Sequence, residues 1–248
     1  MYVRAVLLFM LLQWGFLMAN DTDSISPHFP KRYFFIEGGV TFNSSSLYSL
    51  SGTTSPNFEL KPLRAFGLGI GYAHYFKKIT ASVTLRRVSL GDLITMKSFP
   101  SPSQLPGVFI SGYKNNFLLG FSGGYQLQLK KLSIHPTMGI AISLNPPLNS
   151  NSMAYVTGGN DTILMARSMR LTSGTLLFAT TGLSVTYPVR ISSFDFSVGL
   201  SCSYALGLLS GYSSTTSFKY QTNEYTFKVA NKGTHVMYAL QMVFPLDE

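Results

Sequence analysis

The chain has 248 residues, a formal net charge of +9, 46% hydrophobic residues and only 12% charged residues. That charged fraction is about half of the roughly 25% found in soluble domains. The single cysteine excludes an intrachain disulfide framework and a cysteine-based zinc cluster. Beyond the first twenty residues, no stretch approaches the roughly 20 apolar residues of a membrane-spanning helix. A chain that is apolar on average but never in long runs indicates strands of alternating polarity.

The first segment has the pattern of a secretory signal peptide. Met1–Arg4 carries one positive charge, Ala5–Met18 is almost entirely apolar, and Ala19 precedes a polar run. This apolar run is short for a membrane anchor, which is the alternative interpretation. We therefore expect residues 1–19 to be a cleaved signal peptide and residues 20–32 to be a flexible leader.

From residue 33 onward, eight segments alternate between apolar and small residues, as β-strands do. Their approximate ranges are Tyr33–Phe42, Arg64–Phe76, Ile79–Leu90, Asn115–Leu129, Leu132–Leu144, Thr172–Tyr187, Phe194–Leu209 and Thr234–Phe244. The alternation is less clean in the first and sixth segments, where Phe35, Leu176 and Phe178 fall on the polar face. Proline cannot donate a ladder hydrogen bond, so we expect the fifth strand to start after Pro136 or to carry a bulge.

The links between these segments alternate strictly between short and long. The short links are residues 77–78, 130–131 and 188–193, and the long links are residues 43–63, 91–114, 145–171 and 210–233. An up-and-down antiparallel sheet has this pattern when one rim is trimmed and the other is elaborated. Within two long links, Ala154–Met165 and Ser217–Lys228 each read as strand, turn and strand, which predicts two hairpins beyond the sheet.

The composition of the polar face of the strands distinguishes a membrane barrel from a soluble, lipocalin-like barrel. A water-facing exterior is rich in lysine and glutamate. Here that face holds Gly, Ala, Ser and Thr with three charged residues, Glu37, Arg86 and Asp195, while the opposite face is bulky and apolar. Closed barrels satisfy every backbone group in lipid. The sequence therefore predicts an all-β fold, an eight-stranded antiparallel up-and-down transmembrane β-barrel with long loops and hairpins at one rim.

This pattern resembles the small Gram-negative outer-membrane barrels of the OmpA transmembrane-domain and OmpX kind, often labelled the porin family. The resemblance covers about residues 33–244 and includes an alternating last strand that ends in an aromatic residue, Tyr238–Phe244, although Pro245–Glu248 follows it. It implies a barrel domain over residues 33–248 in the outer membrane, assembled by the barrel assembly machinery. The leader and the short turns would then be periplasmic, and the long loops extracellular.

The resemblance also implies aromatic girdles at the two membrane interfaces. Phe76, Tyr187, Phe194 and Phe244 would belong to the periplasmic girdle, and Phe42, Phe66 and Phe117 to the extracellular one.

Eight strands enclose an interior that side chains fill, so we expect a packed lumen and no open pore. An inward-facing charge needs a partner or water. The sequence therefore predicts a structural polar network in the lumen, formed by Glu37, Arg86, Gln126, Gln128, His135, Asp195 and Gln241. A gated ion path or a proton relay is the alternative role for such residues.

Basic residues gather toward the rim with the long links. They include Arg64, Arg87, Lys114, Arg167 and Arg170. Arginine suits phosphate groups, so these residues are candidate contacts to outer-membrane lipid and lipopolysaccharide. Ordinary snorkelling of long side chains to the interface is the alternative. We expect no nucleic-acid partner in this compartment.

No spacing of residues singles out a catalytic set, a metal site or a cofactor motif. A lipid-modifying site would need a serine, a histidine and an acid near the outer rim, where His235 and Asp92 are candidates. We expect a non-enzymatic protein without cofactor, with a structural or surface-binding role and a protein partner at the extracellular hairpins. The alternatives are an accessory barrel of a secretion or envelope machine and a lipid A-modifying enzyme.

Overall fold

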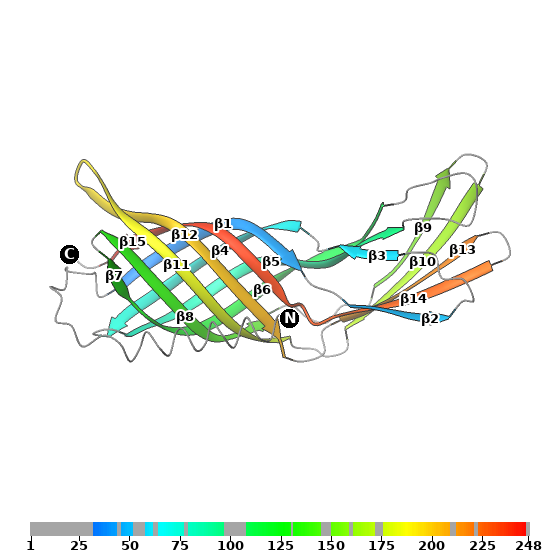
Figure 1. Cartoon of the computed structure of the whole chain (residues 1–248), viewed down its shortest axis with the longest axis horizontal. Helices are drawn as coiled ribbons and strands as arrows, with labels where there is room; N and C mark the ends of the chain where they lie inside the picture. Colours follow the sequence, from blue (N-terminus) through cyan, green and yellow to red (C-terminus); the bar gives the residue numbers. More distant parts are fainter. Residues whose placement is uncertain are drawn as a thin grey trace.

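The computed structural model describes the chain from Arg32 to Leu246, with gaps (Figure 1). The described ranges are 32–43, 46–51, 58–61, 64–76, 79–96, 108–129, 131–144, 150–158, 161–171, 176–208, 212–220 and 223–246. The predicted signal peptide and residues 20–31 of the predicted leader lie outside these ranges. Arg32, which we assigned to the leader, is the first residue of the first strand.

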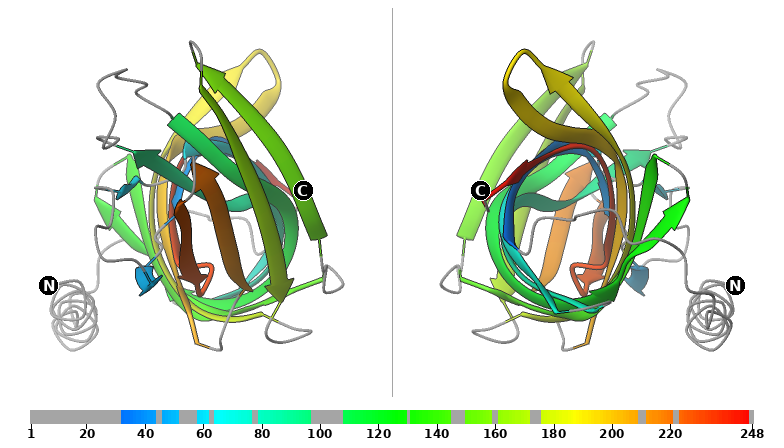
Figure 2. Two further views of the ribbon diagram at one scale, coloured as in Figure 1. Left: turned by 90° about the vertical axis from the view of Figure 1, so that its right-hand side faces the viewer. Right: turned by 90° about the vertical axis from the view of Figure 1, so that its left-hand side faces the viewer.

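Eight of the described strands form the predicted barrel. They are β1 (Arg32–Asn43), β4 (Arg64–Phe76), β5 (Ile79–Met96), β6 (Val108–Tyr125), β8 (Leu132–Ser143), β11 (Leu177–Ile191), β12 (Phe194–Gly207) and β15 (His235–Pro245). Each pairs antiparallel with the next, and β15 pairs with β1, so the sheet closes on itself. Viewed along its axis, the barrel is a complete ring (Figure 2). The predicted fold is confirmed. Within the described ranges no helix is long and apolar enough to cross a membrane.

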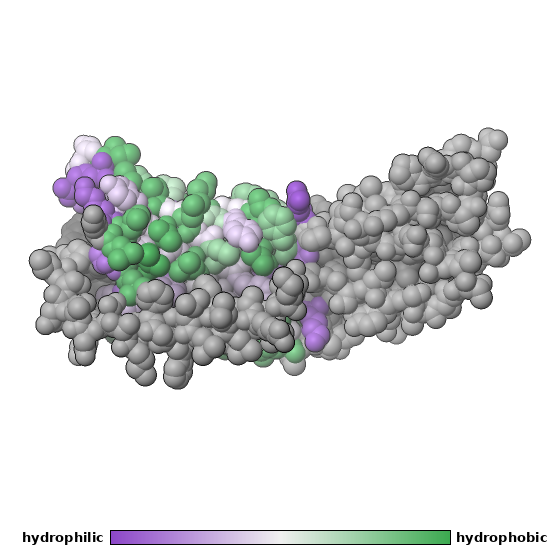
Figure 3. Space-filling model, viewed as in Figure 1, coloured by the Kyte–Doolittle hydropathy of each residue, from purple (hydrophilic) through white to green (hydrophobic). Residues whose placement is uncertain are grey.

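The two faces of the barrel wall follow the alternation of the sequence. Leu200 of β12 is opposite Leu240 of β15, and both side chains point outward, with Leu200 66% exposed. The next pair, Ser201 and Ala239, points into the barrel. Hydrophobic side chains gather over the outside of the barrel strands (Figure 3). This apolar exterior is suited to lipid, because the closed ladder leaves no backbone edge exposed to it.

Pro136 lies inside β8 without interrupting it. The strand begins at Leu132, four residues before the proline, and keeps an unbroken register with β11, where Leu183 is opposite Pro136. The break lies in the other neighbour: β6 ends at Tyr125, and pairing resumes in β7 (Leu127–Leu129). Our expectation of a later start or a bulge in this strand was wrong. The missing N–H of proline is accommodated by a gap in the adjacent strand.

The link predicted over residues 188–193 is shorter than expected. Strand β11 continues to Ile191, so the connection to β12 is the two-residue turn at Ser192 and Ser193. Pairing of β11 with β8 ends at Thr186, and pairing of β12 with β15 begins at Ser197. Residues 187–196 therefore form a two-stranded hairpin that projects past the barrel rim, visible in yellow at the upper left of Figure 1. We call it the rim hairpin.

The opposite rim carries a separate five-stranded sheet. Its strand order is β2 (Ser46–Ser51), β14 (Asn223–Asn231), β13 (Tyr212–Tyr220), β10 (Asp161–Leu171) and β9 (Ser150–Gly158). Both predicted hairpins are confirmed, as β9–β10 and β13–β14. The sequence did not predict β2, nor β3 (Phe58–Lys61), which pairs with the outer part of β5. This outer sheet extends away from the barrel in Figure 1.

Candidate functional site: the lumen and the two rims

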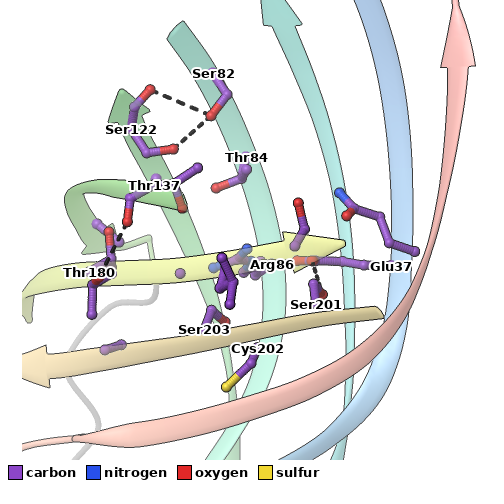
Figure 4. Close-up of a pocket in the computed structure, with 18 of the residues that line it drawn as sticks. Glu37, Ser82, Thr84, Arg86, Ser122, Thr137, Thr180, Ser201, Cys202 and Ser203 are labelled. Carbon is purple, nitrogen blue, oxygen red and sulfur yellow. Dashed lines mark hydrogen bonds and ion pairs between the residues drawn. The ribbon is translucent and has the colours of Figure 1, made fainter. Parts of the chain in front are cut away.

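A polar chamber of about 70 Å³ lies inside the barrel (Figure 4). Charged Glu37 and Arg86 line it together with a set of hydroxyl side chains. These hydroxyls are Ser82, Thr84, Ser122, Thr137, Thr180, Thr181, Ser184, Ser201 and Ser203. An ordered water occupies roughly 10–15 Å³ of such a volume, so the chamber has room for about five waters.

An ion pair spans the chamber wall from β1 to β5. Arg86 Nε donates to Glu37 Oε1 at 2.5 Å, and Ser201 Oγ of β12 donates to Glu37 Oε2 at 3.4 Å. The Glu37 side chain is only 2% exposed. A carboxylate this deeply buried is costly unless it is paired and hydrogen-bonded, and these two donors meet that need.

Gly69 of β4 makes this ion pair possible. In the ladder, Gly69 is directly opposite Glu37 on one side and Arg86 on the other. A Cβ atom at residue 69 would lie 2.5 Å from Glu37 Oε1 and 3.1 Å from Arg86 Cγ. Because β4 separates β1 from β5, the two side chains meet only over a residue without a side chain. A glycine on the inner face of β4 thus leaves the space in which side chains of β1 and β5 can meet.

Other members of the predicted network lie at different depths. His135 and Gln241 line the same chamber as the ion pair, and His135 Nε2 and Gln241 Oε1 have no hydrogen-bond partner among the described residues. Gln126 lies nearer the rim, where its Nε2 donates to Ser133 Oγ at 2.5 Å. Gln128 belongs to β7, beyond the interruption opposite Pro136. The structure therefore brings four of the seven predicted residues to one chamber.

Asp195 does not face the lumen, which corrects our expectation. It lies in the rim hairpin directly opposite Arg190, whose Nε and Nη2 each donate to one carboxylate oxygen at 2.6 Å. Both side chains are exposed. The hydrogen bonds from Arg190 lower the pKa of Asp195. The alternation was read correctly, but β11 and β12 extend past their neighbours, so no barrel wall encloses this position.

An apolar plug fills the outer end of the lumen. It consists of Val88, Leu90, Leu118, Ala141, Leu176, Phe178 and Ala205, all buried. Two of these, Leu176 and Phe178, are the apolar residues that broke the polar pattern of the sixth predicted strand. Three of its members, Leu118, Ala141 and Ala205, also line the chamber, so the plug borders the chamber directly.

His235 lies against the plug rather than at the open rim. Its ring is edge-on to Phe178, with centroids 5.8 Å apart, and its Nδ1 lies 2.8 Å from the carbonyl oxygen of Gly233. Gly233 has a φ of 76°, a left-handed conformation that glycine adopts without strain. The side chain of Asp92, the other candidate for a catalytic set, lies outside the described part of the chain.

Two of the predicted lipid-contact arginines have described side chains. Arg64 is exposed at the outer end of β4, with its guanidinium carbon 5.6 Å from the centre of the Phe42 ring. Arg87 is exposed on the outside of β5, between Leu68 and Phe117. Lys114, Arg167 and Arg170 lie in β6 and β10, and their side chains are outside the described part.

Sequence reasoning missed a polar clasp at the outer end of β1. Asn43 Nδ2 donates to the carbonyl oxygen of Ser89 at 2.6 Å, and Ser89 Oγ donates to Asn115 Oδ1 at 2.8 Å. The β4–β5 ladder ends at Leu68 and Arg87, so Ser89 lies beyond its last pair. The Asn43 side chain of β1 therefore donates to the Ser89 carbonyl oxygen, which has no pair in β4. Nothing in the period-two pattern indicates such a long-range contact.

Comparisons with known proteins give structural matches only. No protein-family model matches the chain, and no curated protein matches it. Among solved structures, OprG from Pseudomonas aeruginosa matches with a TM-score of 0.47 and 13% identity, over 87% of this chain and 97% of that one. Neisserial surface protein A matches with a TM-score of 0.41 and 12% identity, also over 87% and 97%. The N-terminal barrel of Pseudomonas aeruginosa OprF matches with a TM-score of 0.39, 8% identity and the same coverage.

The fold assignment rests on this chain's own strand order. A closed ring of eight antiparallel strands in sequence order, with an apolar exterior, is the architecture of the small barrels of the OmpA and OmpX kind. The resemblance inferred from the sequence is confirmed at the level of the fold.

Proposed function

We propose that this protein is an outer-membrane barrel that presents its five-stranded outer sheet to a partner protein at the cell surface. The observation that carries the proposal is the edge of that sheet at β9, which pairs with β10 alone among the strands that the structure describes. Strand β9, with the sequence SNSMAYVTG, ends the strand order and contains neither a charged residue nor a proline. Charges and prolines are the usual protection of an edge strand. An unprotected edge offers backbone groups for the addition of a partner's strand.

Location in the outer membrane is supported by three features. The exterior of the barrel is apolar, the first nineteen residues have the pattern of a signal peptide, and the aromatic and basic side chains lie where interfaces would fall. In this proposal the short turns face the periplasm and the outer sheet faces the medium. Assembly would use the barrel assembly machinery, as for other barrels of this kind.

Contact with lipopolysaccharide belongs to the same proposal. Arg64 and Arg87 are exposed on an otherwise apolar exterior close to the rim of the outer sheet. Guanidinium groups bind phosphate oxygens in a fork geometry, and the neighbouring Phe42 and Phe117 supply apolar surface for acyl chains. Replacing both arginines with alanine should reduce the amount of lipopolysaccharide that co-purifies with the barrel, while Lys131→Ala at the opposite rim should not.

A binding role is favoured over transport and over catalysis. The apolar plug borders the chamber with buried side chains, which argues against an open aqueous path through the barrel. His235 contacts Phe178 and a backbone carbonyl, which is a structural environment for a histidine. An accessory role in an envelope machine remains the alternative. It would place the partner at the periplasmic rim instead of at β9.

Site-specific photocrosslinking on whole cells tests the proposal. A crosslinking residue is placed at Ser150, Ser152 or Ala154 of β9, and control residues are placed at Ser214 or Thr216 of the central strand β13. We expect a discrete protein adduct from β9 and none from β13, and a lysine pair at Ser152 and Ala154 should abolish it. A further crosslinking residue is placed at Lys131, in a short turn of the opposite rim. Adducts from this position without adducts from β9 would contradict the surface role and favour the envelope machine.

A further inference from the structure

The rim hairpin, residues 187–196, has two chemically distinct faces. On one face the cross-strand pairs are Tyr187 with Val198, Val189 with Phe196, and Ile191 with Phe194. On the other face they are Pro188 with Ser197 and Arg190 with Asp195. The first face is apolar and aromatic. Ile191 is 62% exposed and Phe194 is 56% exposed, although both lie beyond the last residues that pair with β8 or β15.

The apolar face of the hairpin continues the outer surface of the barrel. Along β12 the same side of the strand carries Phe194, Phe196, Val198 and Leu200, and Leu200 lies in the middle of the apolar exterior. No bulge interrupts this row, because the β11–β12 register is continuous from Phe178 to Ile191. The surface that faces lipid on the barrel therefore extends onto the hairpin without a break.

Aromatic contacts tie this face to the neighbouring strands. The Phe244 ring of β15 lies 6.1 Å from that of Phe194 and 6.4 Å from that of Phe196, and Phe34 of β1 lies 6.4 Å from Phe244 on its other side. These four phenylalanine rings form one cluster across β1, β15 and β12, and the cluster reaches Phe194 beside the turn of the hairpin. Aromatic residues of membrane barrels concentrate at the level of the lipid head groups.

The other face of the hairpin is polar and electrically balanced. The Arg190–Asp195 pair uses two parallel hydrogen bonds, so the hairpin carries no net charge at neutral pH. A balanced pair gives no electrostatic attraction for a charged protein partner. It does keep one face of the hairpin wet while the other is apolar, which is the pattern of an element that lies in a membrane interface.

We propose that the rim hairpin is an interfacial anchor. Its apolar face, formed by Tyr187, Val189, Ile191, Phe194 and Phe196, lies in the head-group region of the phospholipid leaflet at this rim, and its ion pair faces water. The occupant is lipid rather than protein because the face is continuous with the lipid-facing exterior of the barrel. The inference rests on the proposed membrane location, in which this leaflet is the periplasmic one.

Depth-dependent fluorescence quenching tests the anchor. Single tryptophans are introduced as Ile191→Trp, Arg190→Trp and Leu200→Trp. The only native tryptophan, Trp14, lies in the predicted signal peptide, and Trp14→Phe removes its emission from any chain that retains this segment. The full chain is reconstituted in phosphatidylcholine vesicles whose acyl chains are brominated either near the head group or near the chain end. We expect shallow bromines to quench Ile191→Trp several-fold more strongly than Arg190→Trp. Deep bromines should quench Leu200→Trp most.

The outcomes separate the anchor from the proposed function. Quenching of Leu200→Trp without quenching of Ile191→Trp would overturn the anchor and leave the membrane barrel standing, with the hairpin projecting into water or reserved for a protein. Absence of quenching at Leu200→Trp would overturn the membrane barrel itself. A Phe194→Trp variant repeats the hairpin measurement on the second strand, so the result does not depend on one substitution.

Discussion

Two arginine–carboxylate pairs of this protein have the same chemistry and opposite settings. The pair of Arg86 and Glu37 lies inside the barrel and joins strands that are not neighbours, whereas the pair of Arg190 and Asp195 lies on the exposed rim hairpin between adjacent residues of a ladder. Buried charges depend on each other, because removal of one leaves the other unsolvated. Exposed charges are hydrated whether or not they are paired. The environment, rather than the contact distance, decides what each pair contributes.

The largest effect is expected from breaking the buried pair on one side only. Arg86→Ala leaves Glu37 buried without its main donor, which should lower the free energy of unfolding by about 3–5 kcal/mol. Urea unfolding of the barrel in vesicles, followed by circular dichroism, measures the change. The double variant Glu37→Gln, Arg86→Met removes both charges and should recover most of the loss. If the single and double variants were equally unstable, the interdependence of the two charges would be disproved.

A third setting for charge is the lipid-facing side of β12. Leu200→Arg places a guanidinium on the apolar exterior and should cost roughly 2–4 kcal/mol near the bilayer midplane. Ser201→Ala, one residue along the strand and facing the lumen, should cost far less, since only the weak 3.4 Å hydrogen bond to Glu37 is lost. The same unfolding assay compares the two. The reverse order would mean that the two faces of the wall have been exchanged.

A smaller effect is expected from filling the space over Gly69 of β4, where Glu37 and Arg86 meet. Gly69→Ala places a methyl group against Glu37 and Arg86, so the ion pair must shift, and overpacking of this kind costs about 1–3 kcal/mol. Gly38→Ala on the outer face meets the flexible end of Leu68 at 3.3 Å and the edge of the Phe66 ring at 3.6 Å, an ordinary contact distance, and serves as the matched control. A Gly69→Ala protein as stable as the Gly38→Ala protein would show that Glu37 and Arg86 can pair without the space over residue 69.

The smallest effect is expected at the exposed pair. The hydrogen bonds from Arg190 lower the pKa of Asp195, so the stabilisation from this pair is present above the ordinary aspartate pKa and is lost as the pH falls through the lowered value. Arg190→Ala should therefore leave the unfolding midpoint nearly unchanged at pH 7 and nearly independent of pH between 7 and 5. A large loss at neutral pH would show that the pair holds the hairpin in place.

The sequence predicted the barrel well because the signal for it is repeated. Each strand crosses one membrane with one face to lipid, so the same alternation recurs eight times, and Leu200 and Ser201 were assigned to the correct faces from their positions alone. The ends of strands carry no such repetition. Asp195 was placed in the lumen because alternation reports the face of a strand and not where its neighbours stop.

For the lumen, the sequence predicted that charged side chains need polar partners but did not predict which residues those partners are. The pattern indicated that Glu37 and Arg86 needed partners, and the structure pairs them with each other over Gly69. It gave no indication of Ser201 as the second donor, because register between distant strands depends on barrel shear, which one strand does not encode. Asn43 was missed for the same reason, since its partner Ser89 is two strands away.

The connection between the outer sheet and the barrel is short. Strand β14 ends at Asn231 and β15 begins at His235, so only residues 232–234 lie between them. Three residues reach at most about 10 Å when fully extended. The outer sheet is therefore joined to the barrel by a short segment and not by a long tether, so a protein that added its strand to β9 would be held within a limited range of distances from the barrel rim.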